Sequence, residues 1–502
     1  MLDAELPDLV IIDESFYQSQ LVGTEKDAKE ITLKDIKDSG WNADLIEALV
    51  NMKIGLPVLK ELRTTFGGDL NAIIENATVI TAGKMQKAQS IIGMGYMQQV
   101  EYAANLPTKN RLNVFLGVLQ KELATGRDEA YGIVPTKTGY KLMYRRDMTR
   151  IAGIPALLID ADSNAEVISQ FFEEFEYEEI PVKRKMRVIQ VWNTRNSYNH
   201  MLEEKTGKKK VADIQLLINR LTKDGTNLFV AGPQCIVGNP SDDCEKFVEP
   251  RVTVPEGSGV EHFGNLRGVD LHKNMSIALI ISRNQPPLEA IENTARALYY
   301  DSKVQLKLGI ADWMLKTLPT QPRMYSTTTG YKKVVDVQVH PDPKVQNLLE
   351  LVRECETIQA IDRIRLVWGV MRDVYILSNL VLPIPVTHLV TWNDCIRGTT
   401  KLREALEACD GVLPITAEWL AESLPFIFSK RTARDLVKSY RADKTAIEND
   451  LFANYGHMIK TYWFSQNLHS AVKSICVSFY DADETKARLE TLLQKKVFNF
   501  ES

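Results

Sequence analysis

The stretch MSIALIISRNQPPLEAIENTARALYY, residues 275–300, decides the fold class of this chain. Its first part contains a short apolar run at residues 277–281, which predicts a strand. The part that follows, residues 287–300, opens with prolines and has the pattern of a helix. Strands that alternate with helices are typical of a parallel sheet with helices on both of its faces.

The same alternation extends to both sides of the quoted stretch. It predicts strands at residues 188–192, 227–231 and 373–377, and helices at residues 196–204, 211–221 and 344–365. We therefore expect a complete α/β lobe with a parallel sheet over residues 176–382. Leu382-Pro383-Ile384-Pro385 marks the end of this lobe, because proline interrupts regular structure.

The residues before this lobe predict part of another α/β lobe, over residues 1–175. Leu9 to Ile12 and Ala156 to Ile159 are apolar runs that predict buried strands, and each ends in acidic residues. A helical pattern from Thr32 to about Gln120 predicts a helical insertion, and residues 131–144 resemble a hairpin. The tail, residues 383–502, shows helical patterns at 402–408, 417–423 and 432–449, so we expect it to be mostly α.

Composition places the chain among soluble globular proteins with several domains. It has 502 residues, of which 44% are hydrophobic and 25% charged, with a net charge of −4. Because a basic excess over the whole chain is absent, any contact with nucleic acid must come from a local groove. The cysteines form no C-x-x-C pair, the N-terminus is acidic, and prolines and polar residues interrupt the longest apolar run. We therefore expect a cytoplasmic protein without membrane contact.

The acids after the first strand suggest metal and water chemistry. Asp13 and Glu14 follow the apolar run directly. A carboxylate at a strand tip can hold Mg²⁺, and its neighbour can orient an attacking water. The alternative is that the two acids simply begin a surface loop.

A second motif runs from Arg353 to Arg365. Gln359 and Arg363 are four residues apart and share one helix face, whereas Arg365 diverges from it. An arginine on such a helix can stabilise the charge of a γ-phosphate held by another lobe. The alternative is a solvent-exposed face whose arginines pair with neighbouring acids such as Glu354 and Asp362.

A third motif lies just before the strand at residues 277–281. Arg267, Gly268 and Asp270 belong to a loop that combines a glycine with an arginine and an acid. Such a loop suits close approach to a phosphate or to a nucleic-acid backbone. An ordinary turn is the alternative.

The order of these motifs resembles that of superfamily-2 helicases of the XPD/DinG-like group. Asp13-Glu14 looks like motif II, and Asp160 with Asp162 looks like motif III. Arg267 to Asp270 looks like the motif V loop, and Gln359 to Arg365 looks like motif VI. The chain is most similar to the helicase portion of phage and plasmid DNA primase/helicase-like proteins.

The resemblance, which covers about Pro7 to Phe428, implies two RecA-like lobes that bind ATP and Mg²⁺ and act on single- or double-stranded DNA. Asp13 would hold the metal, Glu14 would position water, and Arg363, supported by Gln359 and Arg365, would stabilise the γ-phosphate. Motifs III and V would couple lobe closure to the DNA. The implied role is DNA replication of a phage, plasmid or mobile element.

The sequence departs from the helicase pattern in three places. Asp362 stands where glycine is usual in motif VI, and Asp162 stands where threonine is usual in motif III. No G-x-x-x-x-G-K-[ST] loop, the Walker A motif, occurs, and only nine residues precede Val10. We therefore expect an incomplete first lobe and an upstream chain that supplies this loop. Two alternatives remain: a non-catalytic helicase-like scaffold that binds nucleic acid, and an unrelated α/β enzyme with a metal at its acidic strand tips.

Overall fold

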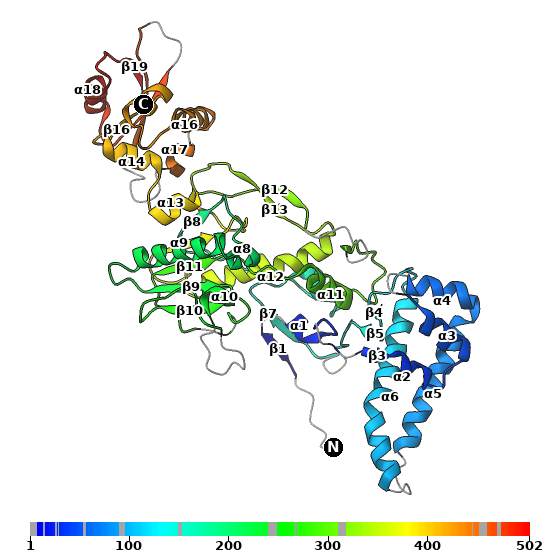
Figure 1. Ribbon diagram of the computed structural model, residues 1–502. Helices are drawn as coiled ribbons and strands as arrows, with labels where there is room; N and C mark the ends of the chain where they lie inside the picture. Colours follow the sequence, from blue (N-terminus) through cyan, green and yellow to red (C-terminus); the bar gives the residue numbers. More distant parts are fainter. Residues whose placement is uncertain are drawn as a thin grey trace. The chain divides into compact units, whose positions relative to one another are not determined.

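The computed structural model describes most of the chain and divides it into two compact units. The described residues are 8–13, 16–25, 28, 30–53, 57–89, 96–148, 153–238, 248–266, 268, 270–309, 318–443, 445–450, 459–468 and 473–501. Unit 1 comprises Met1–Ile180, Pro286–Pro319 and Val339–Val352, and unit 2 comprises Pro181–Gln285, Thr320–Gln338 and Arg353–Ser502. Figure 1 shows the elements of both units.

Helices make up the predicted insertion of unit 1. They are α2 (Leu33–Lys37), α3 (Ala43–Asn51), α4 (Val58–Phe66), the 3-10 turn η1 (Gly67–Asp69), α5 (Leu70–Gln89) and α6 (Tyr96–Leu123). Thr32 begins α2 with a capping box, and the side chain of Asn42 caps α3. The helices bury apolar side chains such as Leu45, Leu59 and Phe115, so the prediction of a helical insertion is confirmed.

The strands of unit 1 form small sheets. Both predicted acid-tipped strands are present, and β1 (Val10–Asp13) pairs in parallel with β7 (Ala156–Ile159), but they are not buried as predicted, because Ile11, Leu157 and Ile159 are exposed. The predicted hairpin is present, because β4 (Ile133–Pro135) pairs antiparallel with β5 (Gly139–Leu142). The other elements of this part are α1 (Phe16–Gln20), β2 (Leu21–Val22), β3 (Glu30–Thr32), β6 (Tyr144–Arg145) and α7 (Ala165–Ile168).

Two segments expected in the second lobe belong to unit 1 instead. Helix α11 (Leu288–Leu298) and the first half of α12 (Pro343–Asp362) pack into the core of unit 1. Ile291, Leu298 and Leu348 are buried there among side chains of α6 and of the small sheets. The pattern of residues 275–300 predicted a strand followed by the helix α11. It could not show that α11 packs in unit 1 while the strand belongs to the sheet of unit 2.

Unit 2 contains the predicted parallel sheet, which has six strands. Its order is β10-β9-β11-β14-β8-β15, and every neighbouring pair is parallel. The strands are β8 (Met186–Val191), β9 (Leu228–Gly232), β10 (Gly259–His262), β11 (Ile277–Ile281), β14 (Arg372–Leu377) and β15 (His388–Val390). The sequence had predicted four of them, β8, β9, β11 and β14.

Helices cover both faces of this sheet. Alternate strand residues such as Ala278 and Ile280 pack with Ile361 and Ile364 around the end of α12. The residues between them, such as Leu279, point to the other face and pack with Leu217 and Ile218 of α9 (Thr206–Leu221). A strand buried on both faces needs apolar residues at consecutive positions, which explains the unbroken apolar runs. The remaining short helices are α8 (Tyr198–Leu202), α10 (Gln234–Val237) and α13 (Trp392–Arg397).

The helices predicted in the tail are present, but the tail also contains a sheet that the prediction of a mostly α tail did not include. Strands β16 (Val412–Ile415), β17 (Lys460–Ser465), β18 (Ser474–Ser478) and β19 (Phe498–Glu501) form an antiparallel sheet in the order β16-β18-β17-β19. The helices around it are α14 (Lys401–Ala408), α15 (Ala417–Ser423), α16 (Lys430–Ala442), α17 (Thr445–Asp450) and α18 (Ala482–Leu493). A separate hairpin of unit 2 joins β12 (Thr320–Met324) to β13 (Val334–Gln338). Within the described residues, no helix has both the length and the apolar content needed to cross a membrane.

A buried carboxyl group links α6 to the β4 region of unit 1. Glu122 is fully buried, and its Oε1 accepts hydrogen bonds from the backbone N–H groups of Tyr131 at 2.5 Å and Gly132 at 2.8 Å. It also faces Arg127, whose Nη2 lies 3.3 Å from Oε1. Burial nevertheless dominates, because a charge is costly in an apolar interior, and it raises the pKa of Glu122 to about 7.

We expect this group to make the stability of unit 1 depend on pH. Because the folded pKa lies above the value of 4.5 for an exposed glutamate, protonation favours the folded state. The contribution of Glu122 to the free energy of unfolding is complete below pH ~4.5. It is lost as the pH rises towards about 7, a change of roughly 3 kcal/mol. Urea unfolding of the parent and of Glu122→Gln should show a steeper slope of stability against pH over this range in the parent. Equal slopes would contradict the assignment.

Candidate functional site

Two of the sequence motifs meet in unit 2. The loop after β10 carries the third motif, and the end of α12 carries the second. Arg365 donates hydrogen bonds to Asp270 Oδ1 from Nε at 2.7 Å and from Nη2 at 2.5 Å, and the two residues are 95 positions apart. The backbone N–H of Gly264 donates to Glu356 Oε1 at 2.6 Å. The loop is thus held against α12 at both of its ends.

This meeting point lies at the end of the parallel sheet where strands β11 and β14 begin. Arg372, the first residue of β14, donates from Nη1 to the carbonyl oxygens of Lys273 at 2.7 Å and Met275 at 2.9 Å, just before β11. Arg365 has a φ of 54°, a left-handed conformation that is uncommon outside glycine and turns the chain away from the helix axis. The paired guanidinium of Arg365 lowers the pKa of Asp270, so this carboxyl is ionised near neutral pH.

Asp362, at the end of α12, has a partner of its own. Arg184 binds Asp362 with both ends of its guanidinium, Nε to Oδ1 at 2.8 Å and Nη2 to Oδ2 at 2.7 Å. A second fork of the same kind joins Arg187 of β8 to Asp373 of β14. Bidentate pairs fix geometry as well as charge. Asp362 therefore anchors the end of α12 to the segment before β8, a role that the sequence reasoning missed because the residues are 178 positions apart.

The second half of α12 is largely buried, unlike a solvent-exposed face with ion pairs. Gln359 is 4% exposed and Glu354 is 5% exposed, whereas Arg363 is half-buried. Arg353 is fully buried and pairs with Glu354 through Nε at 3.0 Å and Nη2 at 2.6 Å. It also donates to the carbonyl oxygen of Gln338 at 2.8 Å. Arg353 is thus a structural partner that positions the helix, and the solvent-face alternative does not hold.

A second arginine near this helix was not singled out from the sequence. Arg283 follows β11 and is 4% exposed, and its Nη2 donates to Gln338 Oε1 at 2.8 Å. Burial, together with the neighbouring charges of Arg353 and Arg195, lowers the pKa of Arg283 to about 10. In the sequence, only the position of Arg283 just after a strand could have marked it as a candidate site residue. Nothing in the sequence shows that its side chain is buried.

A buried histidine, His272, holds the loop between β10 and β11 in place. His272 Nε2 lies 3.1 Å from Glu261 Oε1, and Asn265 Nδ2 donates to Glu261 Oε2 at 3.1 Å. The ring stacks on Phe229 with centroids 4.6 Å apart. A Cβ at Gly259 would lie 2.2 Å from His272 Nδ1, so only glycine fits beside the ring. These contacts hold the loop in place, and His272 Nε2 is occupied by its contact with Glu261.

The acidic strand tips lie in unit 1. In the β1–β7 pair Asp13 is opposite Ile159, so Asp160 emerges from the same edge one position later. Asp160 Oδ1 accepts a hydrogen bond from the backbone N–H of Asp162 at 3.0 Å, which forms a tight turn after β7. Glu14, Arg267 and the side chain of Asp13 lie outside the described part of the chain. Within that part, no three His, Cys, Asp or Glu side chains gather as metal ligands.

Apolar side chains are exposed beside both groups of motif residues. On β1 and β7, Ile11 is 63% exposed and Ile159 is 53% exposed. In unit 2, Leu271 follows Asp270 and is 81% exposed, and Trp368 in the loop after α12 is 73% exposed. Exposed apolar side chains that gather in this way are typical of surfaces that bind another polypeptide or domain.

Comparison of the chain with models of protein families, with curated proteins and with solved structures gives no match.

Proposed function

We propose that the chain is the larger part of a nucleic-acid-dependent ATPase of the superfamily-2 helicase type. The observation that carries the proposal is the contact between its motif V-like loop and its motif VI-like helix end. Arg365 and Asp270 form an ion pair across 95 positions, and Gly264 binds Glu356. This contact supports our interpretation of the two segments as motifs V and VI, which follow each other in this order along the chain.

The sheet of unit 2 supports the same proposal. A six-stranded parallel sheet with helices on both faces is the architecture expected of a second RecA-like lobe. Arg363 follows α12 directly in this unit and is half-buried. In the proposed mechanism its guanidinium stabilises the γ-phosphate of ATP, with Gln359 and Arg365 holding the helix end in place.

Strands β1 and β7 support an incomplete first lobe. A two-stranded parallel sheet is too small to be stable alone, and parallel sheets are normally covered on both faces. Here Leu9, Ile11, Leu157 and Ile159 occupy one face and are about half exposed or more. In our proposal this face and the strand edges receive further strands that carry the Walker A loop. Asp160 follows β7 at the end of the strand pair where β1 ends at Asp13, and a carboxylate is a donor type that suits Mg²⁺.

The test is ATP hydrolysis by the protein purified from its own cells, with and without single-stranded DNA, beside Glu14→Gln. We expect DNA-stimulated turnover in the parent and a loss of about 100-fold or more in the variant, because Glu14 would orient the attacking water. ATP binding should persist in the variant, since a glutamine keeps the size of the side chain.

The sequence also favours a second candidate, a non-catalytic scaffold, because it contains no Walker A loop. Binding of DNA by the parent without any nucleotide affinity or hydrolysis would support the scaffold and exclude the ATPase.

A further inference from the structure

Helix α16 presents a continuous stripe of positive charge. Its 13 residues, KRTARDLVKSYRA, include five cations and a single acid, Asp435. All five cations are exposed: Lys430, Arg431, Arg434, Lys438 and Arg441. At 100° per residue they fall within about 100° of the helix circumference, along roughly 17 Å of its axis. Among the described residues, none of them forms an ion pair.

A neighbouring side of α16 is buried, which fixes the orientation of this stripe. Ala433, Val437 and Tyr440 pack into the core of the tail. Tyr440 also donates a hydrogen bond to Asp450 Oδ2 at 2.8 Å. An amphipathic helix that enters a membrane needs its apolar face free. Because α16 has already buried that face, its cations are available to a partner outside the bilayer.

The position of the charges disagrees with what helix electrostatics favours. The first turn of a helix attracts negative charge, yet α16 begins with Lys430 and Arg431 and has no acid there. Each of these cations is held where the helix itself disfavours it. Such local conflicts are expected where a side chain serves binding, and the ligand that would relieve this one is an anion.

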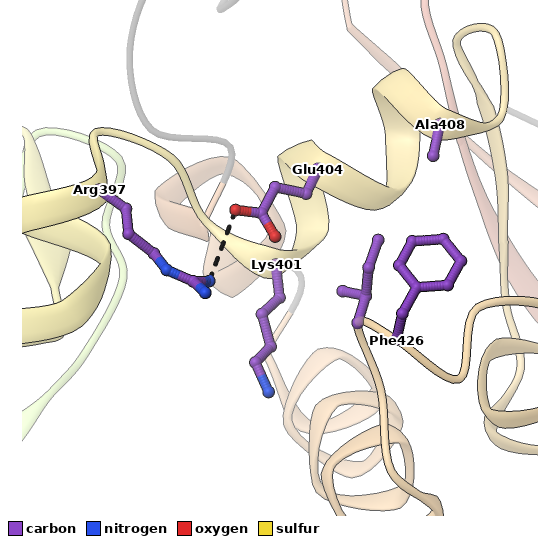
Figure 2. A pocket seen from close by; sticks show the side chains of 6 residues that line it. Arg397, Lys401, Glu404, Ala408 and Phe426 are labelled. Carbon is purple, nitrogen blue, oxygen red and sulfur yellow. Dashed lines mark ion pairs between the residues drawn. The ribbon is translucent and has the colours of Figure 1, made fainter.

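An aromatic side chain and a hollow adjoin the stripe. Phe426 lies four residues before Lys430, is 77% exposed, and lines a hollow of about 430 Å³. Figure 2 shows this hollow with Lys401 of α14 and Phe426 at its sides and with the Arg397–Glu404 ion pair, whose atoms are 3.6 Å apart. Four residues span at most about 14 Å, so a single chain of phosphates can reach from the hollow to the stripe.

We infer that α16 and Phe426 form a binding surface for single-stranded nucleic acid. Cations along a groove follow the phosphates, and an exposed aromatic ring stacks on a base, which is the usual composition of such surfaces. An acidic protein would satisfy the cations but would leave Phe426 without a role. The inference rests on the proposed function only in taking nucleic acid as the substrate, and it places a contact in the tail, far from motifs V and VI in the sequence.

The test measures binding of a fluorescein-labelled 15-nucleotide thymidine strand to the full chain by anisotropy, without nucleotide, from 50 to 200 mM NaCl. The triple variant Arg434→Gln, Lys438→Gln, Arg441→Gln should weaken binding at least ~10-fold. It should also reduce the slope of log affinity against log salt by about 2, because three phosphate contacts are lost. Phe426→Ala should weaken binding roughly 5- to 150-fold, whereas Phe426→Trp should retain it.

The matched control removes three exposed cations from another part of the tail, Lys486→Gln, Lys495→Gln and Lys496→Gln. Its affinity and salt slope should equal those of the parent. Equal losses in both triple variants, or none in either, would overturn the inference. So would binding to phosphatidylserine vesicles in the absence of binding to the strand. The assay contains no ATP, so failure here leaves the test of ATP hydrolysis unaffected.

Discussion

Arg363→Ala should lower DNA-stimulated ATP turnover by about 1000-fold or more, while the protein stays folded. An arginine that reaches the γ-phosphate supplies positive charge as charge builds up in the transition state, and its loss costs orders of magnitude in rate. A factor of 1000 corresponds to about 4 kcal/mol of lost transition-state stabilisation. Arg363 is half-buried at the end of α12, so its removal leaves no large cavity. Steady-state turnover with saturating DNA is the measurement.

Two variants make this result specific. Arg363→Lys keeps the charge but not the planar fork of donors, so we expect it to remain strongly impaired. Arg488→Ala removes an exposed arginine of α18 that pairs with Glu484, and it should leave turnover unchanged. If Arg363→Ala kept more than a tenth of the parent turnover, Arg363 would not act on the γ-phosphate.

The sequence predicted the central architecture because the physical signal is local. Strands such as β11 and β14 are buried on both faces, and this requires consecutive apolar residues that any reader of the sequence can see. Strands β1 and β7 were predicted from similar apolar runs, but their pairing was not, because it joins residues about 146 positions apart. The destination of α11 was not predictable in the same way. Its apolar face fits either a sheet or a helical core, and the structure places it in the core of unit 1.

The tail and the ion pairs of the candidate site lay beyond such local signals. Val412–Ile415 contains Pro414, and Ser474–Ser478 begins and ends with serine, so neither segment has the unbroken apolar run that predicted the strands of the parallel sheet. The partner of Asp362 is 178 positions away, and that of Arg365 is 95 positions away. The motif strings suggested which residues matter, but only the fold shows which charge neutralises which.

Asn449→Ala should destabilise the attachment of the tail to the parallel sheet by roughly 2–5 kcal/mol, because it leaves two buried backbone groups unpaired. Strand β15 is at the edge of that sheet, and Asn449 of α17 takes the place of a neighbouring strand. Its Oδ1 accepts from the N–H of Leu389 at 2.7 Å, and its Nδ2 donates to the carbonyl oxygen of Leu389 at 2.8 Å. The side chain is 2% exposed, so water cannot replace it. Urea unfolding followed by tryptophan fluorescence is the measurement.

Asn219→Ala is the matched control, because Asn219 is an exposed residue of α9, and it should change the free energy of unfolding by less than about 0.5 kcal/mol. Asn449→Asp removes only one of the two hydrogen bonds. An ionised aspartate can accept from the N–H of Leu389 but cannot donate to its carbonyl oxygen. It also places a second carboxylate beside Asp450, whose own pKa burial raises to about 6. We therefore expect Asn449→Asp to be least destabilising at acid pH, where a protonated carboxyl can donate again. A loss that is the same at pH 5 and pH 8 would mean that Asn449 acts through packing alone.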